Sequence, residues 1–106
     1  MCGSGSFYAS AADLCRYEAA LVENRLVSAE SMREATTSGV DAGYNRTGYG
    51  FGWYIDDEWM SHAGSWAGFA AFIQRARQYP YSIYVLGNAE TPDPAEIAQA
   101  AAEIFA

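Results

Sequence analysis

The chain has 106 residues, of which 51% are hydrophobic and 18% are charged, and its formal net charge is −7. This length fits a single domain over 1–106, and this composition excludes a disordered chain. All six cationic residues are arginines that form no basic stripe, and no lysine occurs. We therefore exclude a nucleic-acid-binding protein, and we expect no membrane span because no apolar run is long enough.

The first predicted helix covers about 10–25. Ser10 is a typical N-cap, and the acidic Asp13 lies three residues after it. Apolar residues recur at helical spacing, which predicts that they face the core. They are Leu14, Tyr17 and Leu21, with Cys15 expected beside them as a small core residue.

A second, shorter helix is predicted after Ser28, which is again a typical N-cap, and it is expected to end near Gly39. Together the two helices form a helical part over 10–38. Residues 39–48 are rich in Gly, Asp and Asn and are therefore predicted to be a loop.

Residues 48–90 are predicted to form an antiparallel sheet. GYGFGWYID (48–56) alternates large side chains with glycines, which predicts a strand with one bare face open to another backbone or a ligand. EWMSHAGSW (58–66) and GFAAFIQRAR (68–77) predict two strands joined tightly at Ala67-Gly68, the second apolar on both faces, as expected for a central strand. YSIYVLGN (81–88) predicts a fourth strand after a turn containing Pro80.

The last predicted helix covers 93–105. Asp93 is the expected cap, followed by a proline at the first helical position and an acid at the third. The apolar stripe is expected at Ile97, Ala101 and Ile104. The predicted fold class is α+β: a meander of three to four antiparallel strands, with two N-terminal helices and a C-terminal helix packed on it.

Several motifs do not support a site. The glycines of 48–52 precede no helix, so a nucleotide loop is excluded, and the acids of 56–58 lack the spacing of a calcium loop. Asn45-Arg46-Thr47 matches a glycosylation acceptor, but no secretory signal accompanies it. Cys2, Cys15 and the single histidine cannot complete a zinc shell, so we expect no metal and no cofactor.

Five segments follow one another along the chain: 3–21 (GSGSFYASAADLCRYEAAL), 49–55 (YGFGWYI), 62–73 (HAGSWAGFAAFI), 81–90 (YSIYVLGNAE) and the last helix. In this order they resemble the C-terminal third of the serine β-lactamase and penicillin-binding-protein superfamily, in its class C β-lactamase and D-alanyl-D-alanine carboxypeptidase branch. The resemblance implies a partial β-lactamase/transpeptidase-like fold and a hydrolase whose substrates are small molecules or peptidoglycan-like peptides. Members of this family are commonly exported.

The resemblance also implies roles for residues 62–66, which match the family's His/Lys-x-Gly active-site strand. His62 would contribute to electrostatics and proton transfer, and the backbone N–H of Ser65 would be one of two oxyanion-hole donors. Ala63, Gly64 and Trp66 would contact the substrate, Gly64 by allowing its close approach. Ala63 departs from the Thr or Ser common in the family, so a hydroxyl contact to a substrate carboxylate is lost, which favours ester or peptide substrates over classical β-lactams.

The catalytic motifs of this family are incomplete in the chain. Ser-x-x-Lys cannot occur without a lysine, and no tyrosine is followed two residues later by asparagine. The chain is therefore expected to be the C-terminal portion of such a hydrolase and to be inactive when isolated.

The alternative is a non-catalytic binding or assembly module. In the family, two N-terminal strands lie beside the strand that matches YSIYVLGN. Without them, Ser82 to Asn88 would form an open edge, expected to pair with a second copy or with an N-terminal fragment. A metal or redox protein would lack its ligands.

Overall fold

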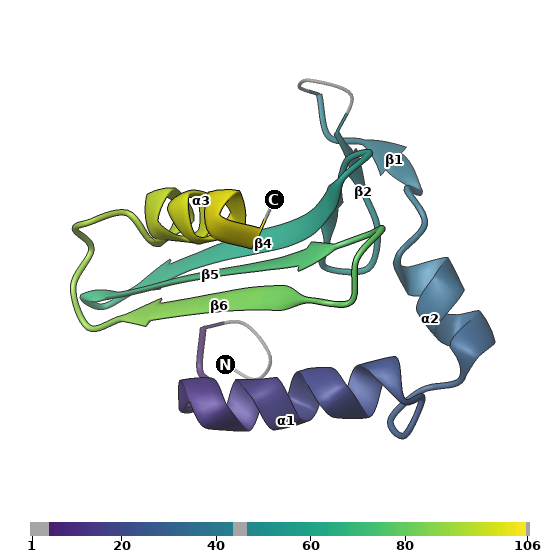
Figure 1. The fold of residues 1–106 in the computed structure, drawn as a ribbon, viewed down its shortest axis with the longest axis horizontal. Helices are drawn as coiled ribbons and strands as arrows, with labels where there is room; N and C mark the ends of the chain where they lie inside the picture. Colours follow the sequence, from purple (N-terminus) through teal and green to yellow (C-terminus); the bar gives the residue numbers. More distant parts are fainter. Residues whose placement is uncertain (1–4, 44–46, 106) are drawn as a thin grey trace.

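The computed structural model describes residues 5–43 and 47–105, so Cys2, Asn45 and Arg46 lie outside the described residues. Within these ranges the chain forms three helices and one antiparallel sheet with the strand order β1-β2-β3-β4-β5-β6 (Figure 1). The elements are α1 (Ala11–Val22), α2 (Ala29–Ala35), β1 (Val40–Asp41), β2 (Gly48–Tyr49), β3 (Tyr54–Ile55), β4 (Trp59–Trp66), β5 (Phe69–Ala76), β6 (Ser82–Gly87) and α3 (Pro94–Phe105). The predicted α+β class is confirmed, with six strands in place of three to four.

The three long strands β4, β5 and β6 lie between two helical layers. α3 covers one face of the sheet, and α1 lies against the other (Figure 1). β5 is hydrogen-bonded to β4 on one side and to β6 on the other. Its two apolar faces therefore suit a central strand, as the sequence predicted.

The predicted helix caps are confirmed. The Ser10 side chain accepts the Asp13 N–H at 3.1 Å, Ser28 accepts that of Ser31 at 3.1 Å, and Asp93 Oδ1 accepts that of Ala95 at 2.9 Å. These short-range bonds satisfy backbone donors that have no partner inside the helix. Each cap depends only on residues that lie within three positions of one another in the chain.

The ends of both N-terminal helices come earlier than predicted. After Val22 the chain makes a Schellman turn, in which Asn24 has a φ of 56° and the Arg25 N–H donates to the Ala20 carbonyl at 2.9 Å. The predicted loop over 39–48 includes β1, whose two residues pair with β2.

The predicted core face of α1 is partly wrong. Leu21 is buried, but Cys15 and Tyr17 are exposed. The residues facing the sheet follow the i, i+4, i+7 spacing of Leu14, Glu18 and Leu21, so the inward position between the two leucines belongs to a carboxylate. The sequence pattern indicated an aromatic side chain there because it did not reveal a partner for Glu18.

The predicted stripe of α3 is wrong at two of its three positions, and the third, Ala101, is half-buried. Ile97 and Ile104 are exposed, and the buried positions are Pro94, Ala98 and Ala102. Small side chains at a spacing of four residues let the helix backbone lie close to the sheet. The larger isoleucines are therefore left at the sides of the contact.

Residues 48–56 do not form one continuous strand. The chain turns between β2 and β3, where the Gly50 N–H donates to the Trp53 carbonyl at 2.9 Å and Gly52 has a φ of 79°. A close approach at a bare glycine, which the sequence predicted, is confirmed at Gly50: a Cβ there would overlap the carbonyl oxygen of Ala35 and lie 2.9 Å from Cδ1 of Ile55. Glycine is therefore required where α2 meets the β2–β3 turn.

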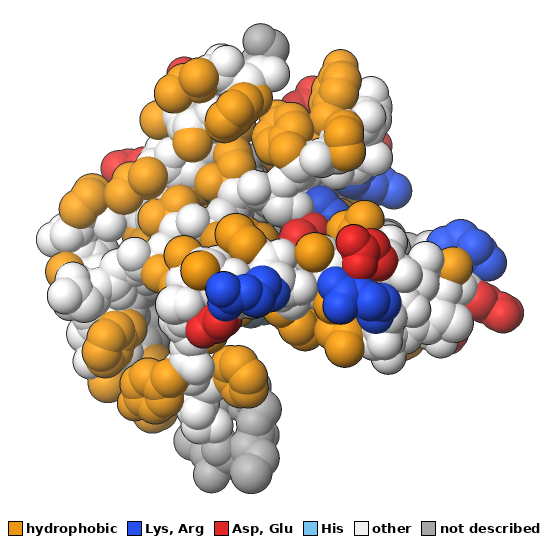
Figure 2. Space-filling view, turned by 60° about the horizontal axis from the view of Figure 1, so that its bottom comes forward, with side chains coloured by type: hydrophobic (Ala, Val, Ile, Leu, Met, Phe, Trp, Pro, Cys, Tyr) orange, Lys and Arg blue, Asp and Glu red, His pale blue; other side chains and the backbone are white. Residues whose placement is uncertain are grey.

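The buried part of the fold is small. No large side chain in the described ranges falls below 2% exposure, and five of the eight buried hydrophobic residues are alanines. Large apolar side chains are instead spread over the surface (Figure 2), including Phe7 at 87% and Trp66 at 58% exposure. None of the described helices has the length and hydropathy needed to span a membrane.

Candidate functional site

The strand predicted to carry the site, β4, forms a regular hairpin with β5. Its register pairs His62 with Ile73 and Ser65 with Ala70. The hairpin closes in two residues, Ala67 and Gly68, both with positive φ, as a type I′ turn requires. Residues 62–66 are therefore held in extended strand conformation.

The side of β4 away from β5 is largely unpaired. Within the described residues, β3 pairs with β4 only at Met60 and Ser61. The Asp56 N–H donates to the Trp59 carbonyl at 3.0 Å, so Trp59 directs its backbone polar groups toward β3. In an antiparallel strand this direction alternates from residue to residue, so the N–H of Ser65 points the same way as that of Trp59. That N–H is directed outward, past the end of β3.

The imidazole of His62 is half-buried beside the tyrosines of β2 and β3. Its Nδ1 lies 2.6 Å from the carbonyl oxygen of Ala63, and because a carbonyl can only accept, Nδ1 carries the proton. Nε2 of the neutral ring is then an acceptor, and it lies 3.3 Å from the hydroxyl of Tyr49. The Tyr54 ring packs at 5.6 Å from the imidazole, centroid to centroid. This arrangement fixes the tautomer and leaves Nε2 as the ring nitrogen that accepts a hydrogen bond.

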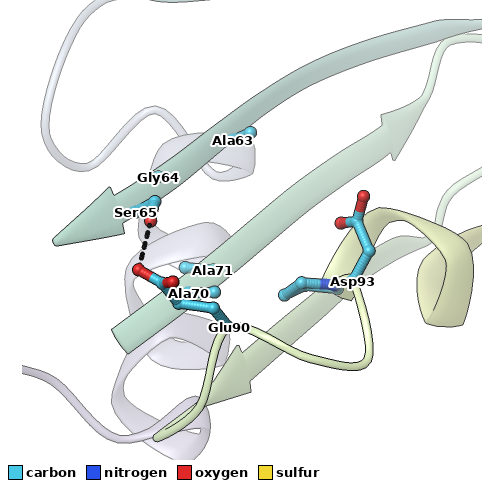
Figure 3. A pocket seen from close by; sticks show the side chains of 8 residues that line it. Ala63, Gly64, Ser65, Ala70, Ala71, Glu90 and Asp93 are labelled. Atoms are coloured by element: carbon cyan, nitrogen blue, oxygen red, sulfur yellow. Dashed lines mark hydrogen bonds between the residues drawn. The ribbon is translucent and has the colours of Figure 1, made fainter. Parts of the chain in front are cut away.

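A shallow pocket of about 310 Å³ lies at the closed end of the β4–β5 hairpin (Figure 3). The hairpin contributes Ala63, Gly64, Ser65, Ala70 and Ala71, and the segment that leads into α3 contributes Glu90, Asp93 and Pro94. The Ser65 hydroxyl donates to Glu90 Oε1 at 3.4 Å (Figure 3). The pocket is therefore built from the predicted strand and from two carboxylates that the sequence analysis did not single out.

The structure separates the five predicted site residues into two groups. Ala63, Gly64 and Ser65 line the pocket, whereas His62 and Trp66 do not. Strand alternation explains the side chains, because Ala63 and Ser65 share one face of the sheet whereas His62 and Trp66 belong to the other. Gly64 has no side chain and lines the pocket through its backbone. Trp66 instead lies near the N-terminal segment, where a Cβ on Gly5 would be 3.6 Å from its indole. Within the described ranges, no group of three metal-ligating side chains is close enough to hold an ion.

A polar network that the sequence analysis missed joins α1 to the sheet. Arg75 donates to Glu18 twice, from Nε at 2.5 Å and from Nη2 at 2.6 Å. Ser82 and Tyr84 also donate to Glu18, at 2.7 and 2.6 Å, and the Arg75 guanidinium lies 5.4 Å from the centroid of the Trp53 ring. These partners are up to 66 residues apart in the chain, so no local pattern could indicate them.

The network shifts the pKa of two of its members, Glu18 and Tyr84. Burial by itself would raise the pKa of the Glu18 carboxyl, but the hydrogen bonds from Arg75, Tyr84 and Ser82 outweigh it and hold that pKa below its ordinary value of 4.5. Burial, together with the neighbouring Glu18 carboxylate, raises the pKa of Tyr84. Glu18 is therefore ionised and Tyr84 neutral at pH 7.

Comparison with known proteins gives one result. A family model described as Beta-lactamase matches residues 2–106, which is nearly the whole chain. No curated protein and no solved structure matches the chain.

Proposed function

The chain belongs to the Beta-lactamase family and is a β-lactamase-like hydrolase segment, and we propose that it supplies the active-site strand of a serine hydrolase. One observation carries this proposal: the Ser65 N–H is directed outward from an unpaired stretch of β4. Acyl transfer places negative charge on the carbonyl oxygen of the substrate, and an N–H already aimed at that oxygen stabilises the charge without reorganisation.

The neighbouring residues suit the same reaction. A Cβ built on Gly64 would meet nothing within 4 Å, so this stretch of strand is open to a planar acyl group. We assign His62 a role in proton transfer through Nε2, with the Tyr49 hydroxyl 3.3 Å away as its relay partner. Trp66, at 58% exposure beside Gly64 and Ser65 in the chain, would bind an apolar part of the substrate.

The nucleophile must then come from another polypeptide segment, because Ser-x-x-Lys cannot occur in a chain without lysine. We propose that this segment packs on the sheet face that also carries α1 and covers apolar side chains now exposed there. These include Trp66 and Phe69, at 58% and 51% exposure. Burying such side chains stabilises association by roughly 25 cal/mol per Å².

Turnover of nitrocefin and of a p-nitrophenyl ester tests this function. We expect the purified chain to hydrolyse neither above the buffer rate. Mixing it with an N-terminal segment of a family member that carries Ser-x-x-Lys should produce turnover, and the matched control is the same segment with that serine replaced by alanine. Hydrolysis by the chain alone that His62→Ala abolishes would contradict the assignment, because the nucleophile would then lie in this chain.

A second candidate function, a non-catalytic assembly module, is favoured by the edge strand β6. Within the described residues β6 pairs only with β5, and alternation directs the N–H of Leu86 away from that partner. We expect concentration-dependent self-association, reduced by Leu86→Pro, which removes an outward N–H without breaking a ladder bond. Sedimentation as a monomer at high concentration would contradict this candidate.

A further inference from the structure

The pocket at the closed end of the β4–β5 hairpin has an unusual charge for a site of acyl transfer. Its ionisable side chains, among the described residues that line it, are the carboxylates of Glu90 and Asp93, and no arginine or histidine lines it (Figure 3). We propose that this pocket selects a substrate with an alkylammonium group beside the scissile acyl group and disfavours one with a carboxylate there. The inference rests on the proposed function, in which Ser65 marks the position of the acyl group.

The first step of the argument concerns hydrogen-bond donors. A carboxylate ligand needs donors, and the one side-chain donor lining the pocket is the Ser65 hydroxyl, which already donates to Glu90 at 3.4 Å. Ala63 presents a methyl group where a hydroxyl could have donated to an anion. An anionic ligand would therefore meet two like charges and no side-chain donor that is unengaged.

The second step concerns the N-terminus of α3, which would ordinarily attract an anion. Here Asp93 occupies those donors itself. Its Oδ1 accepts the Ala95 N–H at 2.9 Å, and its carbonyl accepts those of Glu96 and Ile97 at 3.1 and 3.3 Å. The capping carboxylate also offsets the positive end of the helix dipole, so the helix does not make the electrostatic potential in the pocket positive.

The third step concerns what the pocket offers a cation. The methyl groups of Ala63 and Ala70, on the same face of the sheet, give the floor small apolar groups, which suit the methyl groups of a quaternary or alkylated ammonium. Glu90 and Asp93 supply negative charge from the segment that leads into α3. The net charge of −7 adds a long-range attraction of the same sign, which is strongest at low ionic strength.

Three isosteric probes test the selectivity without any turnover. They are choline, its uncharged carbon analogue 3,3-dimethyl-1-butanol, and the anion 3,3-dimethylbutanoate, each titrated into the ¹⁵N-labelled chain at low ionic strength. We expect choline to shift the amide signals of Ser65, Ala70 and Ala71 with a Kd about fivefold below that of the alcohol. The anion is expected to bind most weakly.

Two double variants separate local charge from net charge. Glu90→Gln with Asp93→Asn should remove the preference for choline, while glutamine can still accept from Ser65 and asparagine can still cap α3. Asp57→Asn with Glu58→Gln changes the net charge by the same amount in the turn before β4, far along the strand from the pocket, and should leave the preference intact.

The inference is overturned if the anion binds as tightly as choline, if no probe shifts the pocket amides, or if both double variants behave alike. These outcomes are independent of the proposed hydrolase function. A pocket that prefers choline in a chain that never supports turnover would reject the function and keep the pocket assignment. Turnover without a preference for choline would keep the hydrolase function and reject the pocket assignment.

Discussion

Replacing Ser65 with proline should reduce turnover by the reconstituted hydrolase roughly 100- to 1,000-fold, the loss expected when one oxyanion-hole donor is removed. Proline lacks both the N–H and the hydroxyl of Ser65, and that N–H points away from β5, so no bond of the β4–β5 ladder is lost. Proline is tolerated at such outward positions of an edge strand.

The matched control is Ser65→Ala, which keeps the N–H and removes the hydroxyl. We expect it to retain most of the activity, because the hydroxyl bonds only to an exposed carboxylate at 3.4 Å. Steady-state kcat and KM for a p-nitrophenyl ester, together with the thermal midpoint of each variant, provide the measurement. If alanine and proline reduce kcat equally while both proteins stay folded, the N–H has no catalytic role.

Replacing Glu18 with glutamine should lower the free energy of unfolding by about 2–3 kcal/mol, the scale of hydrogen bonds to a charged group. The side chains of Glu18 and Arg75 are 13% and 12% exposed, so the variant leaves a nearly buried guanidinium without its counter-charge. Glu23→Gln is the control. Its ion pair with Arg25 is 60% exposed on both sides, and we expect no measurable change in the urea midpoint.

The same carboxylate gives the pH dependence of stability a definite sign. The pKa of Glu18 is lower in the folded chain than its ordinary value of 4.5, so its contribution is complete above that pH. The contribution is lost as the pH falls below 4.5 and through the lowered folded-state pKa. Urea titrations should show the wild type losing more stability than Glu18→Gln over this range. Parallel curves for the two proteins would mean that the network does not hold Glu18 ionised.

The parts of the fold that sequence predicted well depend on neighbouring residues. The helix caps are formed by Ser10, Ser28 and Asp93, whose side chains accept hydrogen bonds from residues two or three positions ahead. The small Ala67-Gly68 pair favours a tight turn between two flanking strands. Such signals act over a few residues and need no knowledge of the rest of the chain.

The parts that sequence predicted badly depend on contacts across the sheet. Glu18 faces inward because Arg75 meets it there, and α3 buries Ala98 and Ala102 because a close approach to the sheet outweighs the burial of larger side chains. The candidate site shows the same division between local signals, which the sequence reveals, and distant contacts, which it does not. The strand position of Ser65 followed from its motif, but the two pocket carboxylates come from a segment about 25 residues further along the chain.

The central claim is that this chain provides the oxyanion-hole strand of a hydrolase and that its nucleophile comes from elsewhere. Intact-mass spectrometry after treatment with a fluorophosphonate tests it directly, on this chain mixed with the N-terminal segment that carries Ser-x-x-Lys. We predict one adduct on the serine of that motif, faster labelling when both segments are present, and an unchanged mass for this chain. An adduct on Ser65, or on any other serine of this chain, would contradict the claim.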